Sequence, residues 1–369
     1  MTPLEKRIRD QIAARGPIAV SDYMSMALGD PEFGYYATRD PFGAAGDFIT
    51  APEISQVFGE LIGLWCAIAW EQAGAPDRAV LVELGPGRGT LMADALRAAA
   101  MSPPFAAAIE LHLVETSPKL RDRQRAALGG RKVTWHDRFD DIPAGPLFLI
   151  ANEFFDALAI DQYVKTESGW RRRGVALNSN SGALCFAVLD SPRRIVPEAL
   201  ENAPIGAILE TNPTAIALAG VIGRRLAECG GGALIIDYGP VESAPGDSLQ
   251  AVSRQHYHDV LATPGEADIT AHVDFQALAR AARWSGAASH GPIPQAALCS
   301  RLGIGPRTEN LLKSATAEQA ASLRAATARL IDPATMGTLF KALALTGPDM
   351  PPPPGFEEPG VEEKIRHAE

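Results

Sequence analysis

The fold of this chain is decided by the stretch Ala79-Val80-Leu81-Val82-Glu83-Leu84-Gly85-Pro86-Gly87-Arg88-Gly89-Thr90. Its apolar first half predicts a short buried strand, and the apolar positions of residues 91–99 predict a helix directly after the turn. Glycines alternate through that turn, where a backbone without Cβ can bend sharply and let a ligand lie against it. A strand, a glycine turn and a helix in this order are typical of a ligand-binding edge in an α/β protein.

The spacing of the glycines indicates which cofactor the turn would hold. Dinucleotide-binding folds carry G-x-G-x-x-G, whereas Gly85, Gly87 and Gly89 read G-x-G-x-G. A carboxylate at Glu83 favours a cationic ligand and repels a pyrophosphate. S-adenosylmethionine carries a sulfonium and an ammonium, so the turn predicts a site for that cofactor. The alternative is a tight turn with no ligand.

Composition narrows the class of protein. The 369 residues are 46% hydrophobic and 21% charged, which is ordinary for a globular protein. A formal net charge of -10 argues against a nucleic acid or an anionic membrane as partner. The four cysteines lie far apart, and no apolar run is long enough to span a membrane. The first residues resemble neither a signal nor a transit peptide, so a cytoplasmic protein is expected.

The order of predicted elements indicates a parallel α/β domain with an insertion. Strands alternating with helices imply right-handed crossovers between parallel strands. The predicted strands are residues 109–114, 132–135, 146–151 and 231–237, with further ones at 286–290 and 339–345. The alternation stops at 160–190, where the polar turn at 178–182 predicts an inserted antiparallel hairpin.

Three parts are therefore expected along the chain. Residues 1–75 would form a helical arm and a cover for the active site, because 30–52 is a long loop rich in glycine and aromatic residues. Residues 76–350 would form the main domain, with the insertion at about 160–210. Residues 351–369 would form a tail that begins with prolines.

Two acids at predicted strand ends extend the expected cofactor site. Glu115 ends the second strand, where a carboxylate can accept hydrogen bonds from ribose hydroxyls. Asp137 follows the third strand, in the usual neighbourhood of an adenine amine. The alternative for Glu115 is a solvated acid at a strand end, and the assignment of Asp137 rests only on strand order.

Three polar residues follow the fourth strand in the crevice expected to hold the methyl acceptor: Asn152, Glu153 and Asp156. On a helical turn Glu153 and Asp156 would face the same way. Paired carboxylates could hold a guanidinium by charge-assisted hydrogen bonds and accept its proton, which it otherwise keeps near neutral pH. Glu153 is the expected base, with Asn152 steering the loop. The alternative is a helix start that carries acids because the macrodipole favours them.

Four further residues are expected on the substrate or cover side: Asp47, Thr50, Asp237 and His272. Asp47 and Thr50 lie in the glycine-rich loop, and Asp237 ends the fifth strand. Asp274 is at least as well explained as a helix cap. The His256-Tyr257-His258 segment is expected to be a surface loop, because no third ligand for a metal has convincing spacing.

Four motifs taken together resemble the MidA family, which includes the mitochondrial complex I assembly arginine methyltransferase and its bacterial relatives. They occupy residues 46–55, 83–90, 151–158 and 268–275, and the resemblance runs in order from about residue 8 to residue 345. Two positions depart from the family pattern. Ala159 replaces a proline, and residues 170–174 lack a glutamate, which puts any substrate contact there in doubt.

The resemblance implies a class I, Rossmann-like methyltransferase fold with a seven-stranded sheet whose last strand is antiparallel. It also implies S-adenosylmethionine as cofactor and, for mitochondrial members, symmetric dimethylation of an arginine in a complex I (NADH dehydrogenase) subunit. Three functions remain open: a protein arginine methyltransferase that aids complex I assembly, a methyltransferase for another small or protein acceptor, and a non-catalytic assembly chaperone with a site like that for S-adenosylmethionine.

Overall fold

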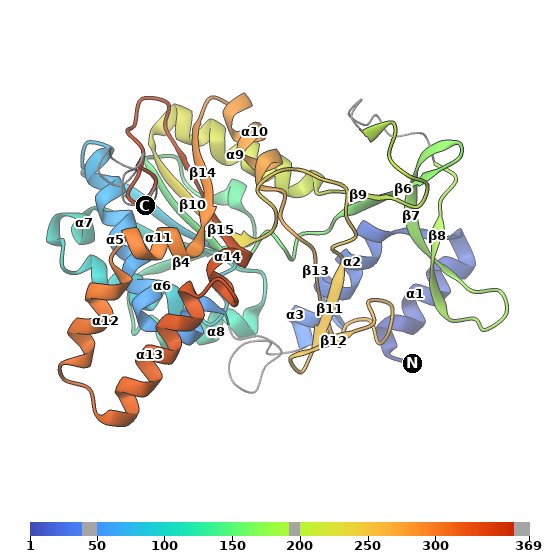
Figure 1. Ribbon diagram of the computed structural model, residues 1–369, viewed down its shortest axis with the longest axis horizontal. Coiled ribbons are helices and arrows are strands. Elements are labelled where there is room, and N and C mark those ends of the chain that lie inside the picture. Colours follow the sequence, from blue (N-terminus) through green and yellow to red (C-terminus); the bar gives the residue numbers. More distant parts are fainter. Residues whose placement is uncertain (39–49, 192–199, 358–369) are drawn as a thin grey trace, which may run out of the picture.

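The larger part of the protein is built on a seven-stranded sheet (Figure 1), in a computed structural model that describes residues 1–38, 50–191 and 200–357. Six strands run one way, and β15 runs antiparallel to both of its neighbours, β10 and β14. This confirms the class I arrangement. The order across the sheet is β14 (Ala288–Pro294), β15 (Phe340–Thr346), β10 (Gly231–Tyr238), β5 (Leu147–Asn152), β2 (Ala79–Leu84), β3 (Ile109–Val114) and β4 (Val133–His136).

Helices cover both faces of this sheet because its strands are apolar on both sides. Along β2, Leu81 belongs to the core on one face and Val82 to the core on the other. The first face is covered by α5 (Gln56–Gln72), α6 (Thr90–Ala99), α7 (Pro103–Ala108), α11 (Gln295–Arg301) and α14 (Met336–Leu339). The second is covered by α9 (Pro213–Cys229) and α10 (Phe275–Trp284). Asn212 caps α9 as expected, since its side chain accepts a hydrogen bond from the amide of Ala215 at 2.9 Å.

A second part, rich in β-strands, lies beside the large sheet (Figure 1). The expected turn at 178–182 joins two of its strands, but the insertion forms a larger sheet than one hairpin. That sheet contains β1 (Ile18–Ala19), β6 (Asp161–Thr166), β7 (Gly169–Leu177), β8 (Leu184–Val188) and β9 (Ile208–Thr211). A three-stranded sheet adjoins it, made of β11 (Gln250–Ser253), β12 (His256–His258) and β13 (Asp268–Thr270). The prediction of a loop at 256–258 is therefore wrong, because these residues pair with β11.

The N-terminal helices α1 (Pro3–Arg15) and α2 (Val20–Gly29) pack in this second part. Leu4, Ile8 and Tyr23 share one core with Ile160 and Ile269. Helix α5, by contrast, packs on the large sheet. The first 75 residues thus contribute to two cores.

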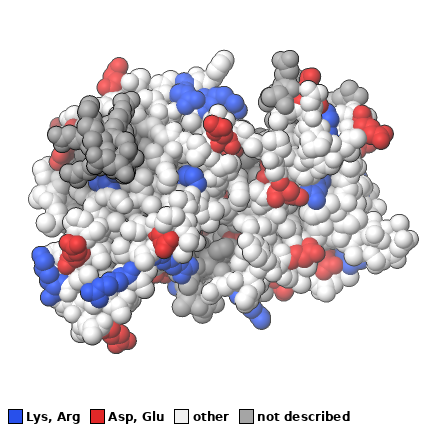
Figure 2. All heavy atoms as spheres, viewed as in Figure 1, with Lys and Arg blue, Asp and Glu red and all other residues white. Residues whose placement is uncertain are grey.

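The remaining described helices are short or peripheral. They are α3 (Tyr35–Thr38), α4 (Ala51–Ile54), α8 (Pro118–Ala127), α12 (Ile304–Leu312) and α13 (Ala317–Ile331). Helices α12 and α13 project from the large-sheet part in Figure 1. Among the described residues, no helix has the length and apolar character needed to span a bilayer. Acidic and basic side chains are interspersed over the face in Figure 2.

Candidate functional site

The glycine turn lies between β2 and α6, at the carboxyl edge of the large sheet. Gly85, Gly87 and Gly89 all have positive φ, at 61°, 52° and 84°, which residues with a side chain rarely adopt. A Cβ on Gly85 would stand 2.8 Å from the ring of Phe154, so this glycine also permits close packing. The sequence places glycine where the backbone requires it.

A small cavity of about 40 Å³ opens beside this turn. It lies at the ends of β2 and β5, where open α/β sheets bind their ligands. Six residues expected from the sequence line it: Thr50, Glu83, Gly85, Gly87, Asn152 and Glu153. The structure therefore brings together residues from three separate motifs. Asp47 lies outside the described residues.

Two buried side-chain oxygens at this cavity have no hydrogen-bond partner among the described residues. They are Oε2 of Glu83 and Oδ1 of Asn152, and both side chains are buried. Burial raises the pKa of Glu83 to about 8, because the charged form is poorly solvated there. Two acceptors without donors beside a glycine turn fit the ammonium and sulfonium groups of S-adenosylmethionine, since a nearby cation would stabilise the carboxylate.

Glu153 occupies an unusual position directly after β5. Its amide donates a hydrogen bond to the carbonyl of Ile236 at 2.8 Å, and its φ of 52° is in the left-handed region. The helical turn expected at this point is therefore wrong, because the chain continues the strand pairing and then bends sharply. A non-glycine residue in this conformation costs about 1–3 kcal/mol and is often found at functional sites.

The carboxylate of Glu153 is held from two directions. Its Oε1 accepts hydrogen bonds from the amide of Ala51 at 3.1 Å and from Nδ2 of Asn152 at 3.1 Å. Burial, opposed by the bond from Ala51, raises the pKa of Glu153 to about 7. A carboxyl that exchanges a proton near neutral pH is suited to act as a general base.

Asp237 supports the turn after β5 through hydrogen bonds to its backbone and does not line the cavity. Its Oδ2 accepts hydrogen bonds from the amides of Phe155 and Asp156, at 3.0 and 3.2 Å, and its Oδ1 accepts one from Tyr238 at 2.9 Å. It is fully buried. Burial, together with the neighbouring Asp156 carboxylate, raises its pKa well above the usual range. Asp156 is also buried, which raises its pKa.

Glu115 is linked to the glycine turn through Gln124. Its carboxylate accepts hydrogen bonds from the amide of Ser117 at 2.8 Å and from Nε2 of Gln124 at 3.2 Å. The same Nε2 donates to the carbonyl of Gly87 at 2.8 Å. Asp137 lies further out, where its carboxylate pairs with Arg121 at 2.7 Å and remains largely exposed.

Sequence reasoning missed Glu53 and Tyr36. Oγ1 of Thr90 donates a 2.6 Å hydrogen bond to Oε1 of Glu53, which also lines the cavity. The hydroxyl of Tyr36 donates to Oδ1 of Asp268 at 3.2 Å. Glu53 and Asp268 both lie in motifs that carry the family resemblance, and that signal could have singled them out.

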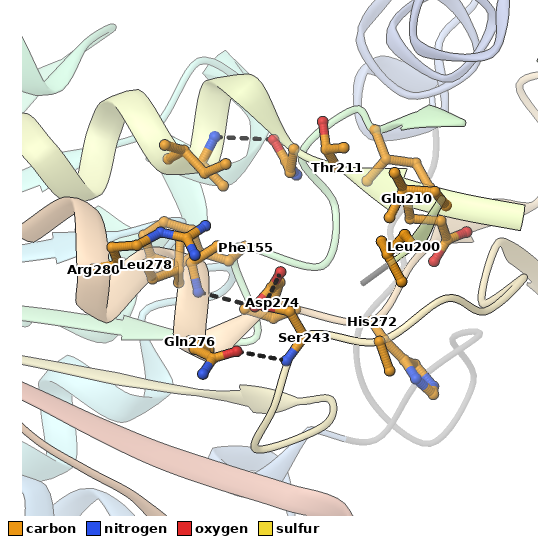
Figure 3. Close-up of a pocket in the computed structure, with 18 residues that line it drawn as sticks. Phe155, Leu200, Glu210, Thr211, Ser243, His272, Asp274, Gln276, Leu278 and Arg280 are labelled. Carbon is orange, nitrogen blue, oxygen red and sulfur yellow. Dashed lines mark hydrogen bonds between the residues drawn. The ribbon is translucent and has the colours of Figure 1, made fainter. Parts of the chain in front are cut away.

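His272 lies away from the glycine turn. It lines a second cavity of about 320 Å³, drawn in Figure 3, and its ring packs edge-on against Tyr238 with centroids 5.7 Å apart. Asp274 caps α10, because its Oδ1 accepts a hydrogen bond from the amide of Ala277 at 2.9 Å. In the described part of the chain, no group of three or more His, Cys, Asp or Glu residues is arranged to hold a metal ion.

The chain matches a known family model over residues 61–293, described as "Putative S-adenosyl-L-methionine-dependent methyltransferase". It is also similar to a solved structure, a COG1565 superfamily member from Burkholderia thailandensis bound to S-adenosyl-homocysteine. The two share 30% sequence identity and a TM-score of 0.82, over 96% of this chain and 92% of that one. These matches support S-adenosylmethionine as the cofactor.

Named relatives match nearly the whole chain. "Protein arginine methyltransferase NDUFAF7, mitochondrial" of Danio rerio is 37% identical, over 91% of this chain and 85% of its own length. The protein of the same name from Homo sapiens is 36% identical, over 94% and 83%. The cytoplasmic location expected from the sequence is corrected by this finding, because these relatives are mitochondrial proteins.

Proposed function

Because the chain belongs to the MidA-like family of S-adenosylmethionine-dependent methyltransferases, we propose that it methylates an arginine side chain of a protein. The names of its relatives support arginine as the acceptor. The observation that carries the proposal is the half-buried side chain of Glu153, whose carboxylate lies at the cavity beside the glycine turn with a pKa of about 7.

On the cofactor side, we assign Glu83, Gly85, Gly87, Gly89, Glu115 and Asp137. S-adenosylmethionine supplies an electrophilic methyl group when it is bound. The unpartnered oxygens of Glu83 and Asn152 are suited to accept hydrogen bonds from its ammonium. Glu115 has acceptor capacity for ribose hydroxyls beyond the bonds it makes to Ser117 and Gln124. Asp137 is exposed enough to reach the adenine end.

On the acceptor side, we assign Glu153 as general base, with Asp156 and Asn152 as its supports. Oε1 of Glu153 is occupied by Ala51 and Asn152, which leaves Oε2 to hold an acceptor guanidinium and take its proton. A buried Asp156 carboxylate nearby disfavours a second negative charge and so keeps Glu153 ready to accept that proton. Asp237 would act as a positioning residue through its bonds to the turn.

The segment before α5 is proposed to shield the reaction from water. Thr50 and Glu53 line the cavity, and Ala51 bonds to Glu153, so residues 50–54 lie over the site. Asp47 and His272 are assigned to the substrate side on sequence position and on the second cavity, respectively. We further propose that the chain divides into an arm at 1–75, a domain at 76–350 and a tail at 351–369.

The acceptor is proposed to be a subunit of NADH dehydrogenase, whose assembly the modification would aid. The purified chain would be incubated with labelled S-adenosylmethionine and candidate subunits, and the modified residue identified by mass spectrometry. Label on arginine supports the proposal. Label on another residue or on a small molecule contradicts the arginine assignment, and cofactor binding with no transfer to any subunit would favour a chaperone.

A further inference from the structure

The second cavity lies next to the turn that carries Glu153. Glu153 lines the small cavity, and Phe155, two residues later, lines the large one of about 320 Å³. Phe154 packs over Gly85, and its ring meets that of Phe155 edge-on with centroids 5.4 Å apart. A group held in the large cavity would therefore be a close neighbour of a group held at Glu153. Its volume is in the range that accommodates a small ligand or a side chain.

The inserted segment and the helices α9 and α10 together form the walls of this cavity. Ile216 on α9 and Leu278 on α10 belong to the part that packs on the large sheet, whereas Leu200 and Leu209 belong to the insertion. In Figure 3, Phe155 and Leu278 lie on one side and Leu200 and Glu210 on the other. The apolar residues on both sides favour an apolar occupant.

The polar residues around the cavity have their oxygens already engaged. Glu210 accepts hydrogen bonds from Nε2 of Gln162 at 2.7 Å and from the amide of Ser248 at 3.1 Å. Asp274 accepts one from Oγ of Ser243 at 2.7 Å as well as capping α10. Few polar atoms are therefore left to orient a small polar ligand, and the cavity selects its occupant mainly by shape and charge. Two carboxylates, those of Glu210 and Asp274, and one guanidinium, that of Arg280, line the cavity. The lining therefore carries a net negative charge and disfavours an acidic occupant.

We propose that this cavity is a specificity subsite, which takes an apolar side chain of the acceptor protein next to the methylated residue and rejects an acidic side chain there. The proposal rests on the proposed function, because it places the methylated residue at Glu153. It also gives the insertion a role, since Leu200 and Leu209 close one wall of the subsite.

The test uses the full chain saturated with S-adenosyl-homocysteine and the capped dipeptide N-acetyl-Leu-Arg-amide as the probe. Saturation-transfer NMR would report which protons of the probe contact the protein. The variant Ala244→Trp fills the exposed mouth of the cavity, and Ala107→Trp places the same side chain on exposed α7 as a matched control. Calorimetric titration with S-adenosyl-homocysteine checks that both variants keep the cofactor site.

The leucine methyl signals should fall about fivefold or more in Ala244→Trp and stay unchanged in Ala107→Trp, since only the first blocks the cavity. N-acetyl-Asp-Arg-amide should give a side-chain signal weaker by a similar factor. Absent leucine signals in the parent chain, or equal signals in both variants, would overturn the subsite. Leucine signals that depend on Ala244, found with no methylation of arginine in any acceptor, would support the subsite and count against the proposed function.

Discussion

The amide of Ala51 donates a 3.1 Å hydrogen bond to the carboxylate of Glu153, although 102 positions separate the two residues. This bond joins the segment that precedes α5 to the turn that follows β5. It occupies one oxygen of Glu153 and leaves the other for an acceptor. The same contact places the proposed cover and the candidate base within one hydrogen bond of each other, so movement of residues 50–54 would change the solvation of Glu153.

Gly87→Val should abolish cofactor binding while leaving the fold largely intact. A β-branched residue at the φ of 52° is strained, and its side chain would occupy the cavity beside Glu83. Calorimetric affinity for S-adenosyl-homocysteine should fall by about 10²-fold or more. Gly129→Val is the matched control, because Gly129 has a φ of 60° with open space around it. Unchanged affinity in Gly87→Val would remove the glycine turn from the cofactor site.

Glu83→Gln should stabilise the cofactor-free protein at alkaline pH and weaken cofactor binding. Burial raises the pKa of Glu83 from 4.5 to about 8, so the folded chain holds a proton that the unfolded chain releases. Stability from this group is therefore present below pH 4.5 and lost as pH rises towards 8. Glutamine has no such proton.

The Tm of the Glu83→Gln variant should accordingly fall less between pH 5 and pH 8 than that of the parent chain. Each kcal/mol corresponds to about 1–2 °C in a protein of 369 residues, because the entropy of unfolding is about 2.1 cal/mol/K per residue. Scanning calorimetry of both proteins, with and without S-adenosyl-homocysteine, measures the two effects. An identical pH dependence in parent and variant would show that Glu83 titrates normally.

Glu153→Gln should retain cofactor affinity near that of the parent chain but lower methyl transfer by about 10²-fold or more, as expected for loss of a general base. In the parent chain, transfer should rise as pH increases through about 7, where Glu153 loses its proton, and then level off. The pH profile of the variant should lack this rise in transfer around pH 7. Glu71→Gln, on the exposed end of α5, is the control. Normal transfer by Glu153→Gln would mean that the residue only shapes the turn.

Asp237→Ala should destabilise the fold and abolish transfer without touching the cavity. The change leaves the amides of Phe155, Asp156 and Tyr238 without their acceptor, at about 1–3 kcal/mol for each buried donor. Asp237→Asn should lose less stability than Asp237→Ala, because its side chain keeps one acceptor oxygen. Urea denaturation of both variants, beside the exposed control Asp122→Ala, measures the difference. If Asp237→Ala were as stable as the control, water would have to replace the carboxylate.

The edge of the sheet that carries the glycine turn could be predicted from the sequence because it is built from local pattern. The strand, the positive-φ glycines and Glu83 lie within a dozen residues, and backbone sterics dictate their conformation. The family resemblance added the number of strands and the antiparallel last strand, which is β15. Nothing in residues 152–158 alone, however, indicates a left-handed Glu153. That conformation depends on its bond to Ile236 in a neighbouring strand and on the distant Ala51.

Other features were missed for the same reason. Asp237 has the sequence position of a strand-end ligand residue, yet tertiary packing buries it and engages its oxygens with backbone amides. Likewise, the cavity with Leu200 and Leu209 in its wall exists only because an insertion folds against α9 and α10. Pattern reasoning identifies polar residues at the correct edge of the sheet, but it cannot say which of them support a turn and which face a ligand.

The core shared by the N-terminal helices and the later strands has a consequence for biosynthesis. Leu4 and Ile8 are buried against partners as distant as Ile269. At about 5–20 residues per second, a ribosome would need roughly ten to fifty seconds to supply those partners after the first helix emerges. During that interval an apolar helix face remains exposed to the cell. We therefore expect a holdase chaperone to bind the N-terminal helix of the nascent chain. We also expect that helix to pack into its core only in the last steps of folding.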